Sequence, residues 1–219
     1  MDFVAINSYL PLYMEAFGLT VKIGWIGILI SIVIGIIAAF ISYFKIPVIS
    51  AIVKIYVELF RNTPLLVQLF FIYFGLPKIG IVVSAETCGA VGLGLLGGSY
   101  MAEAFRSGLI SVADSQIESA TALGMSKGQI FIHIILPQAF TISITALVAN
   151  VIFLLKETSV FSAISLMDLM FTAKDLIGLY YNTTECLFLL VIFYIIMLLP
   201  VSFLGTLTEK KVRFGIFGD

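Results

Sequence analysis

Charge is scarce in this sequence of 219 residues: Asp, Glu, Lys and Arg make up 11% of it, less than half of their share in an average soluble domain. Hydrophobic residues make up 61%, and the mean hydropathy is +1.15. A soluble fold cannot bury so much apolar surface, so the composition excludes an ordinary soluble domain. The sequence instead predicts an all-α membrane protein, because roughly 20 apolar residues in a helix span the hydrocarbon core of a bilayer.

Residues that build catalytic and metal sites are also scarce. One histidine, two distant cysteines and no cluster of carboxylates provide neither a set of metal ligands nor an activated nucleophile. The Gly-x-x-x-x-Gly-Lys-Ser/Thr motif of ATP-binding loops is absent. We therefore expect that the chain is not an enzyme, holds no metal or cofactor of its own and binds no nucleic acid. Energy for any transport would come from a partner protein or from an ion gradient.

Five windows predict transmembrane helices within a single domain of residues 1–219. The predicted spans are 20–44, 51–76, 84–107, 137–156 and 185–208. Ser8 to Phe17, followed by Gly18, predicts a separate N-terminal amphipathic segment on the outer surface. Cys88 and Cys186 fall toward the same end of their spans, where a disulfide is conceivable, but we expect two buried thiols.

Positive charge is distributed unequally once the loops are assigned alternately to the two sides of the membrane. With the N-terminus outside, the outer side receives Lys22, Lys78, Lys156 and Lys174, and the inner side receives Lys45, Lys54, Arg106, Lys127, Lys210, Lys211 and Arg213. Positive residues gather on the cytoplasmic side of membrane proteins. We therefore expect an external N-terminus and a cytoplasmic C-terminus.

A polar stretch, residues 115–137, separates the third span from the fourth and lies on the predicted cytoplasmic side. Ser115 and Glu118 have the spacing of a capping box, which predicts the start of a short helix. Gly124 follows where a helix of about two turns needs a left-handed residue to end it.

A second short helix is predicted directly after the glycine. Ser126 and Gln129 have the spacing of another capping box, and Met125 and Ile130 are placed as its hydrophobic staple. Pro137 predicts a change of direction into the fourth span. This helix is apolar on nearly every side, which indicates that part of it docks into another protein or another part of the fold. The alternative is a well-capped connector without a partner.

This stretch resembles the signature of ABC importer permeases, in which Glu-Ala-Ala, three residues, Gly, nine residues and Ile-x-Leu-Pro follow one another. The matching positions, with a serine in place of the first alanine, are Glu118, Ser119, Ala120, Gly124, Ile134, Leu136 and Pro137. In that family the loop forms coupling helices that seat in a groove of the ATP-hydrolysing subunit. The resemblance implies the same role for these residues and for the helix cap Ser126.

The resemblance extends over most of the chain. Glu58 to Pro77, Gly97 to Leu109 and Asn150 to Val160 are similar to the span signatures of permeases for polar amino acids of the histidine, glutamine and arginine type. Ser99 stands where that family usually has alanine, and Glu157 stands where it usually has aspartate. The resemblance implies the type I (MetI-like) permease fold, with five spans and the N-terminal segment, in a bacterial inner membrane.

The partners that the resemblance implies supply what this chain lacks. They are two ATP-binding subunits, which bind ATP and magnesium, a second permease chain that is identical or paralogous, and an external amino-acid-binding protein. An amino acid would be the substrate. We expect the external segment 157–185, with Asp168, Lys174 and Asp175, to contact the binding protein.

Insertion of a charged side chain into the middle of a membrane costs ~2.5–3.5 kcal/mol, so each ionisable residue within the spans is a candidate for function. Glu58 and Arg61 lie three residues apart on the second span, and Glu103 and Arg106 repeat the spacing on the third. Such pairs either complement the charged groups of an amino acid or form structural salt bridges. The predicted substrate pathway contains Glu58, Arg61, Gln68, Glu103, Asn150, Lys156 and Glu157.

Two functions of different classes fit these residues. The first is the permease subunit of an ATP-driven amino-acid importer that works by alternating access. The second is an ion-gradient-driven carrier or channel, in which the intramembrane Glu and Arg pairs form a relay; a purely structural subunit is a third. The carrier predicts inverted repeats with broken helices, and the sequence shows no such internal symmetry. We therefore favour the importer.

Overall fold

The structure, a computed structural model, describes the backbone of residues 1–217 and the side chains of residues 1–212, so the side chain of Arg213 lies outside the described residues. Within this range the chain is all-helical, as predicted, and forms no strand. The α-helices are α1 (Phe3–Tyr43), α2 (Ile49–Arg61), α3 (Leu65–Phe70), α4 (Ala85–Ile110), α5 (Asp114–Ala122), α6 (Lys127–Ile130), α7 (Leu136–Glu157), α8 (Leu169–Tyr180) and α9 (Thr183–Phe217). Tighter or wider turns extend some of them: η1 (Phe71–Gly75), η2 (Leu76–Ile79), η3 (Phe131–Ile135) and η4 (Thr158–Ile164).

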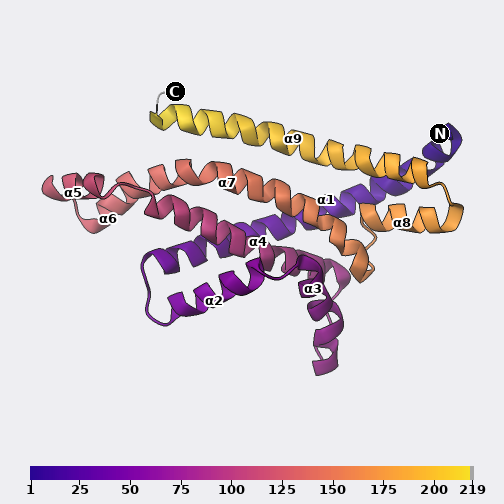
Figure 1. Cartoon of the computed structure of the whole chain (residues 1–219), viewed down its shortest axis with the longest axis horizontal. Coiled ribbons are helices and arrows are strands. Elements are labelled where there is room, and N and C mark those ends of the chain that lie inside the picture. The colour runs from indigo at the N-terminus through magenta and orange to yellow at the C-terminus, as the bar shows by residue number, and fades with distance from the viewer. Residues whose placement is uncertain (218–219) are drawn as a thin grey trace.

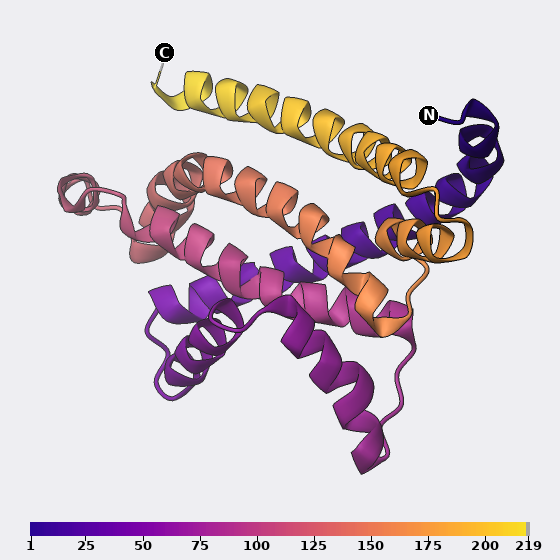
Figure 2. The ribbon, with the colours of Figure 1, turned by 45° about the vertical axis from the view of Figure 1, so that its right-hand side comes forward.

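The long helices α1, α4, α7 and α9 lie lengthwise in the molecule, and α4 packs against both α1 and α7 (Figure 1). Helices α5 and α6 lie at one end, toward which the C-terminus also points, whereas α8 and the N-terminus lie at the opposite end. We call these the α5–α6 end and the α8 end. Helix α3 and the turns after it point away from the bundle (Figure 2). The two ends are therefore distinct, and each carries a different group of connecting helices.

Glycines allow α1 and α4 to approach closely. A Cβ atom at Gly94 would lie 2.5 Å from Ile30 Cγ2, and one at Gly98 would lie 2.7 Å from Ile34 Cγ2, so neither position has room for a side chain. Gly94 and Gly98 thus form a small-xxx-small pair at which the two helices pack closely. Cys88, on α4, is a free, buried thiol, as expected.

The prediction of a separate amphipathic segment before Gly18 is wrong, because α1 runs without interruption from Phe3 to Tyr43. Tertiary contacts outweigh the weak helix propensity of glycine here. The Tyr13 hydroxyl donates to the carbonyl oxygen of Cys186 at 2.7 Å, and the Tyr9 hydroxyl accepts from Asn182 Nδ2 at 2.9 Å. The N-terminal part of α1 thus packs against α8 and α9, and Cys186 is buried without a disulfide.

The second predicted span, 51–76, is wrong as a continuous helix. Helix α2 and the stretch Leu65–Ile79 meet at a bend of 106°. Pro64 explains the break, since it lacks an N–H group and disfavours the helical conformation of Thr63. The polar residues of the predicted span therefore lie at the end of a short helix and not along a straight one.

Three helical stretches of the described residues are long and apolar enough to cross a membrane: Phe3–Tyr43, Lys127–Ile164 and Thr183–Val212. The bent pair gives a fourth. Helix α4 matches the bounds of the third predicted span closely but carries Glu103 and Arg106, which lower its hydropathy. The number of five spans stays a prediction.

The helix is not interrupted at Pro137, where the sequence predicts a change of direction. The preceding turn η3 is a π-helix, in which the Leu136 N–H bonds to the Phe131 carbonyl five residues back. Pro137 then occupies the first turn of α7, where a missing N–H group costs little. The fourth span is thereby joined rigidly to α6.

Candidate functional site

A polar cavity of about 920 Å³ lies between the C-terminal end of α1, the whole of α2 and the second half of α4. Its volume lies at the upper end of the range of ~300–1,000 Å³ that ligand pockets occupy. Five charged side chains line it: Lys54, Glu58, Arg61, Glu103 and Arg106. Three of them are cationic and two are anionic, so the cavity has one positive charge in excess.

Ion pairs connect these side chains in two groups. Glu103 lies between two arginines, with its Oε1 3.0 Å from Arg106 Nη2 and its Oε2 3.7 Å from Arg61 Nη1. Lys54 Nζ lies 4.0 Å from Glu58 Oε1 on the same helix. The predicted Glu103–Arg106 pair is confirmed. The predicted Glu58–Arg61 pair is wrong, because Arg61, the last residue of α2, pairs with Glu103 of α4 instead.

The ion pairs can exchange partners. The side chains of Arg61, Glu103 and Arg106 are 37–41% exposed, and Glu58 is 68% exposed. Exposed pairs of this kind contribute only ~0–1 kcal/mol each. Arg61 keeps its position by a second contact, since its Cζ atom lies 5.3 Å from the centre of the Tyr100 ring. A charged molecule that enters the cavity can therefore replace one partner at low cost.

The break after α2 is bridged by polar side chains that bond to nearby backbone carbonyls. Three polar side chains donate to carbonyl oxygens at the break. Asn62 Nδ2 donates to Glu58 O at 2.7 Å, and Thr63 Oγ1 donates to Leu59 O at 2.7 Å. The third is Gln68, whose Nε2 donates to the carbonyls of Phe60 at 3.1 Å and Thr63 at 2.9 Å.

Three of the seven predicted pathway residues thus meet in the polar cavity, namely Glu58, Arg61 and Glu103. Gln68 is buried at the break. Asn150 is half-buried on α7, Lys156 lines a different cavity of about 510 Å³ between α7 and α9, and Glu157 is half-buried at the end of α7. Whether any of the seven binds substrate stays a prediction.

Sequence reasoning missed several residues of the cavity. Asn62, Tyr100 and Lys54 line it but were not expected there. The signal for the first was the sequence Asn-Thr-Pro at 62–64, which is typical of a break and places Asn62 at its edge. Tyr100 gives no such signal, because its position beside Arg61 depends on how α2 packs on α4.

The second candidate site is the docking segment, residues 114–136, at the α5–α6 end. Helix α5 begins at Asp114, and its N-cap Ala113 makes no side-chain hydrogen bond, so the capping box predicted at Ser115 is wrong. The capping box at Ser126 is confirmed: Gln129 N donates to Ser126 Oγ at 3.3 Å, and Ser126 N donates to Gln129 Oε1 at 2.8 Å.

Gly124 separates the two helices with a φ of +79°, as predicted. Only glycine adopts this left-handed conformation readily. Ala120, Ile130 and Ile135 are buried in a small core against α1 and α4, and the predicted staple residue Met125 packs on it. The docking segment is therefore held in one orientation by its own core.

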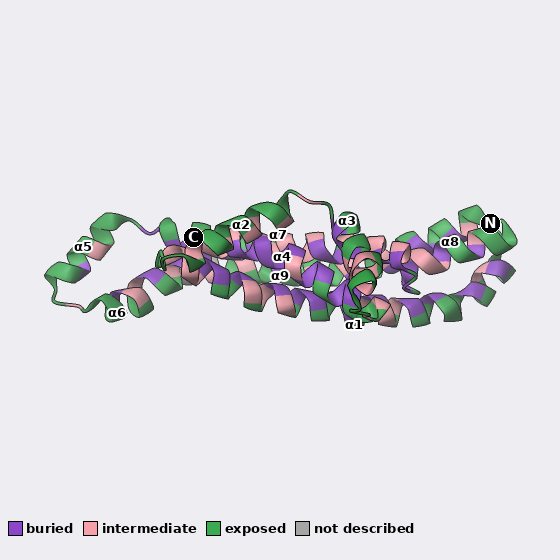
Figure 3. Ribbon diagram, turned by 90° about the horizontal axis from the view of Figure 1, so that it is seen from below, coloured by how far each residue is buried: buried purple, intermediate pink, exposed green. Residues whose placement is uncertain are grey.

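The outer surface of the docking segment remains open. Helix α5 is largely exposed and projects beyond the bundle (Figure 3). Glu118 and Ser119 are exposed, and Leu123 is 83% exposed at the tip, next to Gly124. The docking segment therefore presents a fixed surface that projects beyond the bundle.

At the α8 end, Lys174 and Asp175 are exposed on α8, but Asp168 is fully buried. Asp168 Oδ1 accepts from the N–H of Phe171 at 2.9 Å and caps α8, so the expectation that it contacts an external protein is wrong. Burial raises the pKa of Asp168 to about 7, against the opposing effects of the Phe171 N–H and of Lys174.

Comparison with known proteins gives consistent matches. Residues 31–214 match the family model of the binding-protein-dependent transport system inner membrane component. The arginine transport system permease protein ArtQ of Bacillus subtilis (strain 168) is 33% identical over 216 residues, which are 97% of this chain and 98% of that protein. The probable glutamine ABC transporter permease protein GlnP of the same organism is 35% identical over 180 residues, which are 81% of this chain and 83% of that protein. A crystal structure of an amino acid ABC transporter with histidines has a TM-score of 0.90 at 32% identity and covers 96% of this chain and 99% of its own.

Proposed function

The chain belongs to the family of binding-protein-dependent transport system inner membrane components and has the helical permease fold of that family, and on this premise we propose that it imports polar amino acids with energy from separate ATPase subunits. The chain forms part of a path that opens alternately to the two sides of the membrane. ATP and magnesium bind to the partner subunits.

The observation that carries this proposal is the geometry of the docking segment. Gly124 turns the chain between α5 and a capped α6, and α6 continues through η3 into α7 without a break. A force applied to α5 and α6 is therefore transmitted along one continuous helix into the bundle. This arrangement suits a partner that moves, whereas a simple connector needs no such rigidity.

The charges of the polar cavity support an amino-acid substrate. An amino acid carries a carboxylate and an ammonium group, and the cavity offers Arg61 for the first and Glu58 for the second. The two side chains do not pair with each other, and a charged ligand can replace the exposed partners that they have, Lys54 and Glu103. The printed names of the relatives ArtQ and GlnP, which refer to arginine and glutamine, support the same substrate class.

A relay of protons through these residues is disfavoured by chemistry. The chain of close contacts runs from Arg61 through Glu103 to Arg106. An arginine side chain does not pass a proton on in proteins. A proton-driven carrier would need a group that gains and loses a proton at each end of such a chain, and arginines occupy both ends.

The partners follow from the same premise. A second permease chain completes the path, two ATP-binding subunits seat on the docking segments, and an external binding protein delivers the amino acid to the α8 end. The α5–α6 end then faces the cytoplasm of a bacterial cell, and the N-terminus lies outside. Exposed Lys174 and Asp175 on α8 are available to the binding protein.

Uptake of labelled amino acids by the reconstituted complex tests the role of the cavity. We expect Glu58→Gln and Arg61→Gln each to reduce uptake at least about tenfold, as the loss of a charge-assisted contact of ~1.5–3 kcal/mol implies, with basal ATPase activity kept. Glu86→Gln is the control, because Glu86 forms an exposed ion pair with Lys22 far from the cavity. Unchanged uptake in both cavity variants would remove the cavity from the path.

A further inference from the structure

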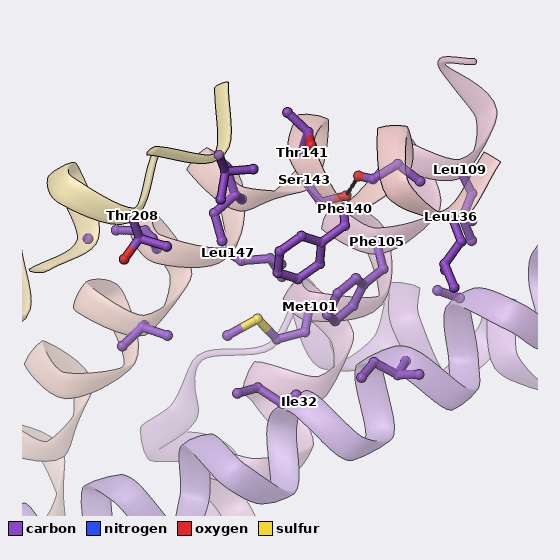
Figure 4. A pocket seen from close by; sticks show the side chains of 18 of the residues that line it. Ile32, Met101, Phe105, Leu109, Leu136, Phe140, Thr141, Ser143, Leu147 and Thr208 are labelled. Carbon is purple, nitrogen blue, oxygen red and sulfur yellow. Dashed lines mark hydrogen bonds between the residues drawn. The ribbon is translucent and has the colours of Figure 1, made fainter. Parts of the chain in front are cut away.

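A second large cavity lies on the side of α9, and it has no part in the path proposed above. Its volume is about 1,050 Å³, and helices α1, α4, α7 and α9 line it in the half of the molecule that ends at α5 and α6. Figure 4 shows Met101, Phe105 and Phe140 pointing into it. The cavity extends from Ile32 and Val201 near the middle of the bundle to Lys211 at its rim.

The lining of this α9 cavity offers few groups that water can bind. Its described polar side chains are Thr141, Ser143, Thr208 and Lys211. Each of the three hydroxyl groups already bonds to a backbone carbonyl four residues earlier, Thr141 to Pro137 O at 3.1 Å, Ser143 to Ala139 O at 2.8 Å and Thr208 to Leu204 O at 2.8 Å, and Ser143 Oγ also lies 3.0 Å from Ala104 O on α4. A buried water needs two to four polar partners, so this surface favours hydrocarbon over water.

The length of the cavity corresponds to one leaflet of a bilayer. The lining residues of α9 run from Val201 to Val212, which is roughly 17 Å of helix. The hydrocarbon core of a bilayer is ~30 Å thick, so one leaflet is about as deep as the cavity is long. The only described charge in the lining, Lys211, lies at the end of the cavity that faces the α5–α6 end.

We propose that this cavity binds one phospholipid with an anionic headgroup, from the leaflet at the α5–α6 end. The acyl chains fill the apolar interior between α9 and the other three helices, and the lipid phosphate lies beside the Lys211 ammonium. The Lys211 ammonium complements the charge of the headgroup, and the length of the cavity matches the thickness of one leaflet. The apolar lining of the cavity suits the acyl chains. The lipid thus supplies the packing between α9 and α1 that the side chains leave open.

Native mass spectrometry of the purified full-length permease in detergent, after delipidation, tests this site with dioleoylphosphatidylglycerol as the probe. We expect one tightly retained lipid per chain, and weaker retention of phosphatidylcholine with the same acyl chains. Lys211→Gln should weaken the phosphatidylglycerol affinity about fivefold, which is the effect of one lysine near an anionic lipid surface. Leu204→Trp, at a position that is 61% exposed and lines the cavity, should abolish retention by filling it.

Matched variants separate this site from general lipid adhesion. Leu207 and Lys210 are exposed on the same helix but lie outside the described lining, so Leu207→Trp and Lys210→Gln should retain the lipid as the wild type does. Equal losses in the control variants would overturn the proposal. So would the absence of a retained lipid in the wild type, or crosslinking of two permease chains through a cysteine placed at Leu204, which would show that a second copy fills the cavity.

Discussion

Replacement of Gly124 by alanine gives a quantitative test of the docking segment. The φ of Gly124 is +79°, and a Cβ atom placed there would meet nothing within 4 Å. The cost of alanine therefore comes from the backbone alone, at ~1–2 kcal/mol for a left-handed residue that is not glycine. Alanine favours the continuation of α5 as a helix, which would displace α6 from its position.

The population of the chain that keeps the left-handed turn at residue 124 should fall by a factor of about 5–30, which corresponds to the same ~1–2 kcal/mol. The affinity of the permease for its ATP-binding subunits, measured by titration in detergent, should fall by this factor, and coupled uptake should fall with it. Gly124→Asn should lose less, because asparagine tolerates the left-handed conformation better than alanine.

Gly128 provides the matched control, because it lies on α6 with a helical φ and with nothing within 4 Å of an added Cβ atom. Gly128→Ala should keep full affinity, since alanine favours a helix interior over glycine by about 1 kcal/mol. If Gly124→Ala bound the ATPase as the wild type does, or if Gly128→Ala lost as much, the reasoning from backbone conformation would be refuted.

Three further changes test the cavity, the break and the cap of α8. Gln68→Leu removes the donor that two backbone carbonyls share at the break, and we expect a loss of about 1–3 kcal/mol in the free energy of unfolding, measured by denaturation in detergent micelles. Glu103→Gln leaves Arg61 and Arg106 without their shared anion, and we expect uptake to fall while the melting temperature changes little, with Glu86→Gln as the unaffected control. For Asp168, the folded-state pKa of about 7 lies above the ordinary aspartate pKa of 3.8, so its folded form retains a proton that the unfolded form releases. Its contribution to stability is therefore greatest below about pH 4 and is lost as the pH rises to about 7, and thermal unfolding of Asp168→Asn should show a smaller decline over this range. An identical pH profile in the variant would contradict the raised pKa.

Most of the features that local chemistry determines were predictable from the sequence, although the capping box at Ser115 is not formed. Gly124 and the Ser126–Gln129 cap depend on residues within one turn of each other, and both are confirmed. The Glu103–Arg106 pair also lies within one helix turn. Each of these depends on spacing alone, and no distant segment competes with it.

The other features that failed depend on distant contacts or on competing signals. Gly18 lies inside a helix because the preceding residues pack against α8 and α9, which no local pattern reveals. Arg61 pairs with Glu103 because the break at Pro64 ends α2 there and α4 lies opposite. The apolar run 51–76 hid this break, although Asn-Thr-Pro within it was a sufficient signal. Pro137 lies within a helix because the π-helical turn η3 comes directly before it, so that Pro137 falls in the first turn of α7, where its missing N–H costs little.

Uptake into sealed proteoliposomes tests most directly whether this chain is driven through its docking segment by a separate ATPase. The permease would be reconstituted with its ATP-binding subunits and binding protein, with ATP at the ATPase side and the proton gradient collapsed by an uncoupler. We predict that uptake of the amino acid continues under these conditions and stops when ATP is withheld. Accumulation of the amino acid by the permease alone, on an imposed ion gradient and without any nucleotide, would contradict the account.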